Sequence, residues 1–124
     1  MKIACVDFAD TSAKGLESGE LVTTVGGQFI DSMFPFVLMY NRLAGTPLTE
    51  EAVEIPVNFI TCTTASQFND YMKYVHGDVF PYTADEVKAL IKKFNPDASV
   101  ETLKKWGSTF SIEEVKTRHA EYFK

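Results

Sequence analysis

The sequence predicts an α/β fold: a partial, parallel three-stranded sheet in the order β-α-β-α-β, followed by a helical C-terminal extension. Two observations lead to this prediction. Residues 2–28 hold two short apolar runs with one short helical segment between them, and such a strand–helix–strand unit makes neighbouring parallel strands. From residue 63 onward the pattern is helical, with three helix-start motifs. We therefore divide the chain into residues 1–77, which form the sheet, and residues 78–124, a helical extension packed on it.

The first half of the chain contains the two strands and a short helix. Residues 2–6 are apolar, as in a strand buried on both faces. A helix follows over residues 11–18, with Asp10 or Thr11 as its N-cap and Gly19 placed to end it in a left-handed turn. The second strand is predicted at residues 21–25, before Gly26 and Gly27.

The next helix is rich in aromatic and aliphatic residues on all sides, so we expect it to be largely buried. Proline is tolerated only in the first turn of a helix. The helix therefore starts near residues 31–32, or it starts at Gln28 and kinks at Pro35, and we favour the later start. Gly45 marks its end. The third strand is predicted at residues 53–62. Pro56 cannot donate to a ladder, which places this strand at an edge or a hinge crossing.

Three capping-box motifs, each a Ser or Thr with Glu or Gln three residues later, define helices in the second half. They are Thr64–Gln67, Thr83–Glu86 and Ser111–Glu114. The predicted helices cover residues 65–76, 84–94 and 112–123, with a weaker helix at 99–106.

The composition narrows the class of protein. The 124 residues are 45% hydrophobic and carry a net charge of −5, so the chain can bury a core and a nucleic-acid surface is not expected. No stretch is long enough to span a membrane, and no signal peptide is visible. The spacing of Cys, His, Asp and Glu matches no metal motif, and no metal or cofactor is expected.

A candidate ligand site lies where the two parallel strands end. Asp7 follows the first strand and Gln28 follows the second. Ligands of open parallel sheets bind beyond the carboxyl ends of the strands, so we expect this carboxylate and amide to lie side by side. Such groups hydrogen-bond sugar hydroxyls. Phe8 and Phe29 follow these two positions and could stack on a sugar ring, although at least one of them should pack in the core.

The order of these motifs resembles the C-terminal lobe of periplasmic sugar-binding proteins of the ribose-binding type. The resemblance covers residues 2–62 and rests on four features: the strand ending in Val6-Asp7, the Gly-Glu-Leu of residues 19–21 leading into a Thr-containing strand, the helix ending in residues 41–45, and the late strand at 54–60. In the family, an aspartate and a polar residue after the next strand contact the sugar. Asp7 matches the first, and Gln28 matches the second with a shift of one residue from Gly27.

The resemblance implies a binding protein without chemistry that feeds a sugar to an ABC transporter. The partners would be a sugar, the transporter's membrane subunits and a missing N-terminal lobe. The full-length protein would be periplasmic or extracellular and membrane-tethered, with a signal upstream. The family protein is about twice as long, which predicts that this chain is a fragment or a truncated relative. A fragment with uncovered strand edges should also self-associate.

Two other classes remain open at this point. The effector lobe of a sugar-responsive transcription regulator has the same fold and the same aspartate. A cysteine-dependent enzyme would use Cys62 with His76 or His119 as its base, although Cys5 and Cys62 are more simply two buried thiols.

Overall fold

The computed structural model describes residues 1–123 and divides them into two compact units. Unit 1 comprises residues 1–28, residues 59–81 and the segment from Ser111 to the end of the described residues. Unit 2 comprises residues 29–58 and 82–110. The boundary predicted between residues 77 and 78 does not coincide with this division, because each unit takes segments from both sides of it. No helix among the described residues is long and apolar enough to cross a membrane.

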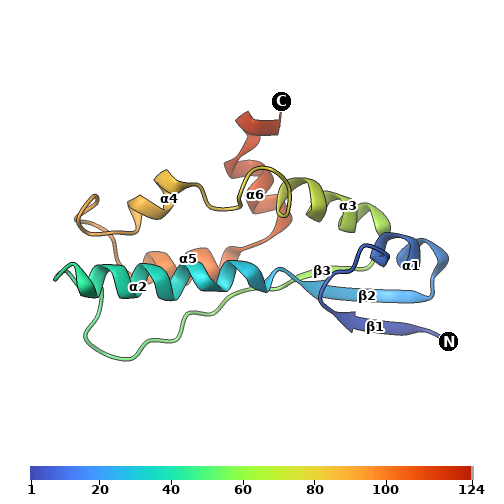
Figure 1. The fold of residues 1–124 in the computed structure, drawn as a ribbon, viewed down its shortest axis with the longest axis horizontal. Coiled ribbons are helices and arrows are strands. Elements are labelled where there is room, and N and C mark those ends of the chain that lie inside the picture. Colours follow the sequence, from blue (N-terminus) through green and yellow to red (C-terminus); the bar gives the residue numbers. More distant parts are fainter. Residues whose placement is uncertain (124) are drawn as a thin grey trace. The chain divides into compact units, whose positions relative to one another are not determined.

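Unit 1 contains a mixed three-stranded sheet in the order β1-β2-β3 (Figure 1). Strand β1 (Ile3–Val6) pairs with β2 (Leu21–Gly26) in parallel, as the sequence predicts. The third strand differs from the prediction, because β3 (Ile60–Cys62) runs antiparallel to β2 and is only three residues long. The all-parallel sheet is therefore wrong, and the α/β class is confirmed.

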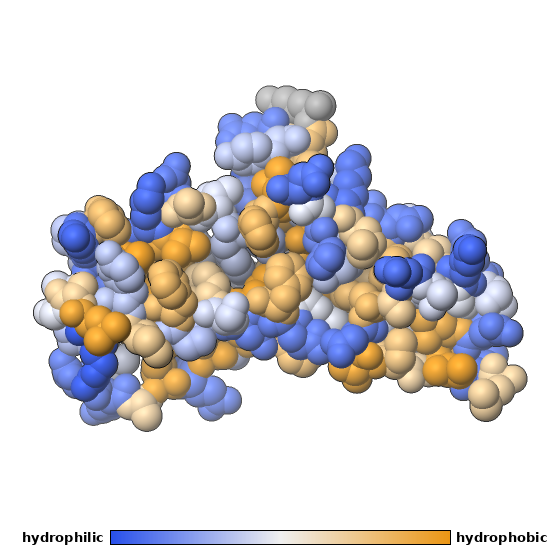
Figure 2. Space-filling view, in the orientation of Figure 1, coloured by the Kyte–Doolittle hydropathy of each residue, from blue (hydrophilic) through white to orange (hydrophobic). Residues whose placement is uncertain are grey.

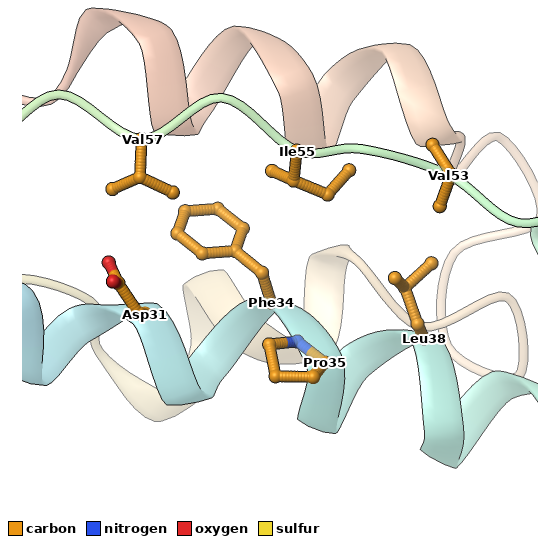
Figure 3. A pocket seen from close by; sticks show the side chains of 7 residues that line it. All are labelled: Asp31, Phe34, Pro35, Leu38, Val53, Ile55 and Val57. Atoms are coloured by element: carbon orange, nitrogen blue, oxygen red, sulfur yellow. The ribbon is translucent and has the colours of Figure 1, made fainter.

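The path of the chain before β3 explains the change of direction. Residues 53–57 form an extended segment outside the sheet that lies beside helix α2 (Met33–Leu43) and runs opposite to it (Figure 3). Within unit 2, the chain therefore reverses its direction between α2 and residues 53–57. Pro56 lacks a ladder donor, and the N–H of Asn58 donates to the carbonyl of Gly107 at 3.0 Å. Strand pairing begins only at Ile60.

Strand β1 is an exposed edge and is not buried on both faces as predicted. Ile3 is 45% exposed and Val6 is 69% exposed. Strand β2 takes the central position, and Thr24 in its middle is fully buried. A run of apolar residues indicates a strand, but how deeply that strand is buried depends on how many strands pair beyond its outer edge. In the described residues none pairs there.

Three helices and a short 3₁₀ turn complete unit 1. Helix α1 (Ser12–Ser18) packs on β2 and on α3 (Ala65–Tyr74), and α3 also packs on α6 (Ile112–Arg118). Lys116 of α6 lies 3.4 Å from Asp70 of α3, and the 3₁₀ turn η2 (Ala120–Phe123) brings Phe123 against Tyr74. The main buried side chains are Leu16, Phe68, Tyr71, Val75 and Val115.

Unit 2 is built on α2, α4 (Ala84–Ala89) and α5 (Val100–Thr109). The 3₁₀ turn η1 (Gln28–Ser32) precedes α2 and places Pro35 in the first turn of the helix, which confirms the later start. Buried Asn41 joins α2 to the chain after α4: its amide donates to the carbonyl of Leu90, and its carbonyl accepts from the N–H of Lys92. The core side chains are Phe34, Val37, Leu90, Leu103 and Phe110.

Helix α2 is less buried than predicted. Phe34 and Val37 are buried, but Phe36, Met39 and Leu43 are 53%, 62% and 82% exposed. These three residues recur at helical spacing and share one face of α2. The apolar residues on nearly all sides of α2 predicted burial on all sides, whereas only the face that carries Phe34 and Val37 is buried.

The capping boxes locate the helices correctly but not all of their ends. Both halves of the box form at Thr64 and Thr83. At Ser111 the side chain accepts from the N–H of Glu114, while the Glu114 carboxylate binds Arg118. Helix α4 ends at Ala89 instead of residue 94, and Thr11 occupies the N-cap of α1 without a side-chain bond. Gly19 ends α1 in the predicted left-handed conformation.

Candidate functional site

The structure brings Asp7 and Gln28 together at the carboxyl end of the parallel strands. The Asp7 N–H donates to the carbonyl of Val25 at 2.7 Å, which extends the β1–β2 ladder by one residue. Beyond this bond, Gln28 Nε2 donates to Asp7 Oδ1 at 2.9 Å, and the pair lies at the surface. Two residues 21 positions apart in the sequence therefore form one polar site.

Asp7 adopts a left-handed backbone conformation with φ of 72°, which is uncommon for a residue other than glycine. Among the described residues it is the only non-glycine with positive φ. Aspartate tolerates this region better than most residues, but the conformation still costs free energy and is retained only where the surroundings impose it.

The surroundings of Asp7 fix its carbonyl. Thr24 Oγ1 donates to the Asp7 carbonyl oxygen at 2.6 Å, and the Cys5 thiol lies 3.8 Å from the same oxygen. The Cys5 thiol also donates to Thr24 Oγ1 at 3.2 Å. Since Thr24 is fully buried in the central strand, this hydroxyl is a rigid support. It holds the turn so that the Asp7 carboxylate faces Gln28.

The pair keeps unused hydrogen-bonding capacity. A carboxylate offers about four lone-pair directions, and a primary amide offers two N–H donors and a carbonyl acceptor. The bond between Asp7 and Gln28 uses one donor and one acceptor. An exposed group that both donates and accepts is suited to a hydroxyl, which also does both.

Phe8 lies in an aromatic cluster within unit 1. Its ring centroid lies 4.2 Å from that of Tyr71 and 5.5 Å from that of Phe68. The ring also covers Gly26, since a Cβ at that position would lie 2.7 Å from Phe8 Cε2. Phe8 is thus half-buried and packs against the core side chains Phe68 and Tyr71 of unit 1, the alternative that the sequence left open for one of the two phenylalanines. Phe29 belongs to unit 2 and is 43% exposed.

The structure places the Cys62 thiol in the interior of unit 1. Cys62 is fully buried, and burial raises the pKa of its thiol to about 11. A thiol acting as a nucleophile needs a lowered pKa and access to solvent. Burial, with smaller contributions from Cys62 and Asp7, also raises the pKa of Tyr71 to about 12. Cys5 and Cys62 are both free and lie on strands separated by β2.

Sequence reasoning missed Thr24 as the support of Asp7. A threonine in a strand is expected from β propensity alone, so its identity gives no signal. The strand alternation could have given its position. In the ladder, Thr24 pairs with Cys5 on one side and with Cys62 on the other.

The fold and this site define an α/β chain with a three-stranded mixed sheet, C-terminal helices and an exposed carboxylate–amide pair at the sheet's carboxyl end. Comparison of the chain with protein-family models, with curated proteins and with solved structures found no match.

Proposed function

We propose that this chain binds a sugar at Asp7 and Gln28 without performing chemistry on it. The observation that carries the proposal is the left-handed Asp7, whose carboxylate meets the Gln28 amide at 2.9 Å at the protein surface. Strained backbone at a surface position that other residues fix is found mainly at functional sites.

The chemistry of a sugar fits the pair. Each sugar hydroxyl needs a hydrogen-bond acceptor and a donor. A carboxylate beside an amide supplies both, as close together as two neighbouring hydroxyls of a sugar. Hydrogen bonds to an ionised carboxylate are about twice as strong as those between neutral groups. The strand-end location agrees with where ligands of parallel strands bind.

The wider role follows from the resemblance to ribose-type binding proteins. In that role the chain is one lobe of a periplasmic or extracellular protein that closes on a sugar by a hinge motion and delivers it to a transporter's membrane subunits. A single lobe supplies half of the closing cleft, so the isolated chain should bind a sugar weakly, with a dissociation constant in the millimolar range, about −4 kcal/mol.

The test is a saturation-transfer NMR experiment on the chain with a panel of pentoses and hexoses, comparing wild type with Asp7→Gly and Gln28→Ala. Glycine accepts a positive φ without strain, and the hydrogen bonds that fix the turn are made by the Asp7 backbone. Asp7→Gly should therefore keep the fold while removing the carboxylate.

We expect at least one sugar to bind the wild type, and Asp7→Gly to lose about 1.5–3 kcal/mol, the range for hydrogen bonds to charged groups. Gln28→Ala should lose about 1 kcal/mol. Equal binding by wild type and Asp7→Gly would show that Asp7 only forms a turn, and the proposal would be withdrawn.

A further inference from the structure

Unit 2 contains an apolar groove between α2 and the extended segment 53–57 (Figure 3). Its cavity has a volume of about 240 Å³, below the range of about 300–1,000 Å³ for drug-sized ligands. Six apolar side chains line it: Phe34, Pro35 and Leu38 from α2, and Val53, Ile55 and Val57 from the facing segment. The groove would therefore hold a small ligand or one end of a longer one.

The sequence pattern creates the two walls. Val53, Ile55 and Val57 alternate with exposed Glu54 and Pro56, so an extended backbone turns the three aliphatic side chains to one side. On α2 the lining residues recur at helical spacing. The side chains of the two walls face one another across the groove (Figure 3).

Among the described residues, Asp31 is the only charged one that lines this 240 Å³ cavity. Its carboxylate points into the gap toward Val57 (Figure 3). Its Oδ1 atom is buried and, within residues 1–123, has no hydrogen-bond partner. Burial raises the pKa of this carboxyl above its ordinary value, and no neighbouring charge contributes to that shift. A desolvated carboxylate oxygen without a partner is unfavourable, and a bound donor would satisfy it.

The lining excludes several ligand classes. A metal ion needs several oxygen, nitrogen or sulfur ligands, and one carboxylate cannot supply them. An anionic ligand would place like charges together in an apolar site. A sugar would leave most of its hydroxyls unpaired against the aliphatic walls. The ligand class that fits both the apolar walls and the Asp31 carboxylate has one cationic hydrogen-bond donor on an apolar body.

We propose that the groove binds a small organic amine, with its primary ammonium group on Asp31 and its apolar body between α2 and the 53–57 segment. This site lies in unit 2 and takes a different ligand class from the Asp7–Gln28 pair of unit 1, so it is independent of the sugar proposal. The ammonium donates to Oδ1 and neutralises the carboxylate, and the aliphatic body covers Phe34, Leu38 and Ile55.

The groove continues beyond Leu38 and Val53. A neighbouring cavity of about 440 Å³ shares these two residues and Pro35. It adds the apolar side chains of Met39 and Leu48, and the charged Arg42 and Glu51 also line it. A longer alkyl chain would extend into it and bury more apolar surface. Each additional buried methylene contributes about 0.8 kcal/mol when fully desolvated, or roughly a fourfold gain in affinity. Affinity should therefore rise with chain length.

The test is an NMR titration of the ¹⁵N-labelled chain at pH 7 with butylamine, hexylamine and octylamine, together with 1-hexanol and hexanoate as matched ligands. We expect hexylamine to shift the amides of Val53, Ile55 and Val57, to bind about tenfold or more tightly than hexanol, and to bind more tightly than butylamine. Hexanoate should not bind.

Two variants separate the carboxylate from general attraction to an acidic protein. Asp31→Asn should weaken hexylamine binding about tenfold or more and leave hexanol binding unchanged, which also shows that the groove is intact. Asp97→Asn removes an exposed carboxylate of the same unit that does not line the groove and should change nothing. Equal binding of hexylamine and hexanol, equal effects of the two variants, or no shifts along 53–57 would each overturn the proposal.

Discussion

Thr24 shows how one buried hydroxyl determines the position of a surface carboxylate. Its Oγ1 donates to the carbonyl of the left-handed Asp7 and accepts from the Cys5 thiol. The neighbouring Thr23 offers a contrast, because its Oγ1 is buried and has no hydrogen-bond partner in the described part of the chain. The Thr24 hydroxyl therefore stabilises the fold through its hydrogen bonds, whereas the buried Thr23 hydroxyl is unfavourable.

Replacing each threonine by valine tests this contrast. Thr24→Val should lower the free energy of unfolding by about 1–2 kcal/mol, because the Asp7 carbonyl loses its donor. Thr23→Val should be neutral or stabilising, since it removes a buried hydroxyl that bonds to nothing. Urea denaturation of the two variants measures both values. A larger loss for Thr23→Val than for Thr24→Val would contradict the assigned hydrogen bonds.

Asp31 predicts a pH dependence of stability with a defined sign. Burial raises the pKa of its carboxyl above the ordinary value of 3.8, so the folded state binds this proton more tightly than the unfolded state. The contribution of Asp31 to the free energy of unfolding therefore falls as the pH rises through 3.8 and the folded-state pKa. Within residues 1–123, the other residues that line the 240 Å³ cavity around Asp31 carry no charge.

The measurement is urea denaturation of wild type and Asp31→Asn at pH 3 and pH 7. Asparagine cannot ionise, so the stability of Asp31→Asn relative to wild type should be higher at pH 7 than at pH 3. A relative stability that falls between pH 3 and pH 7 would mean that Asp31 stabilises α2 through its charge near the helix N-terminus.

At the scale of single residues, the sequence predicted the Asp7–Gln28 pair from position alone, because both residues directly follow strands that the apolar runs define. It could not predict the left-handed conformation of Asp7 or the role of Thr24. Both depend on hydrogen bonds between strands. Asp31 was missed because its significance depends on the facing segment 53–57, which lies more than twenty residues away in the sequence.

Among the secondary-structure elements, Gly107 sets how closely α5 can approach the extended segment. A Cβ at this position would clash with the backbone carbonyl oxygen of Pro56. Two residues beyond Pro56, Asn58 donates through its N–H to the carbonyl of Gly107 and through its side-chain amide to the carbonyl of Ser108. The segment that forms one wall of the groove is thus attached directly to α5.

Gly107→Ala should therefore destabilise the chain by about 2–3 kcal/mol, because the clash is with backbone and cannot be relieved by a rotamer change. In an exposed helix interior the same change would be stabilising by up to about 1 kcal/mol. Ser108→Ala, at the neighbouring exposed position, is the control and should change stability little. Thermal unfolding of both variants provides the comparison, and a stabilising Gly107→Ala would disprove the close packing of α5 on this segment.

The helices were more predictable than the sheet for a physical reason. A capping box joins residues three apart, so Thr64 and Thr83 indicate helix starts without knowledge of the rest of the fold. The direction of β3 depends instead on the route of residues 29–59. In the sequence, Pro56 indicates an edge strand or a hinge crossing over residues 53–62, but not that residues 53–57 leave the sheet and pack on α2.

For the whole molecule, the arrangement of exposed apolar groups predicts self-association. The outer edge of β1 is unpaired among the described residues, and Ile3 and Val6 are exposed on it. Apolar side chains reach the surface at several places on the face shown in Figure 2. An open strand edge is a template for pairing with another chain, and closed two-fold pairing is the commonest arrangement of identical chains.

We expect a dimer at micromolar concentration in sedimentation velocity, formed by pairing of two β1 edges. Val6→Lys should shift it to monomer, because a lysine on an edge strand opposes pairing. Leu43→Lys, which changes the exposed face of α2, should leave the dimer intact. A wild-type monomer would contradict self-association, and a dimer broken only by Leu43→Lys would place the interface on α2.

The most direct test of the central claim, that the Asp7–Gln28 pair is a sugar site, is a ¹H–¹⁵N titration of the chain with pentoses and hexoses up to high millimolar concentration. Our account predicts saturable shifts of the Gln28 side-chain amide and of the Asp7 backbone amide with at least one sugar, absent in Asp7→Gly. Shifts confined to other residues, or none with any sugar while the protein remains folded, would contradict it.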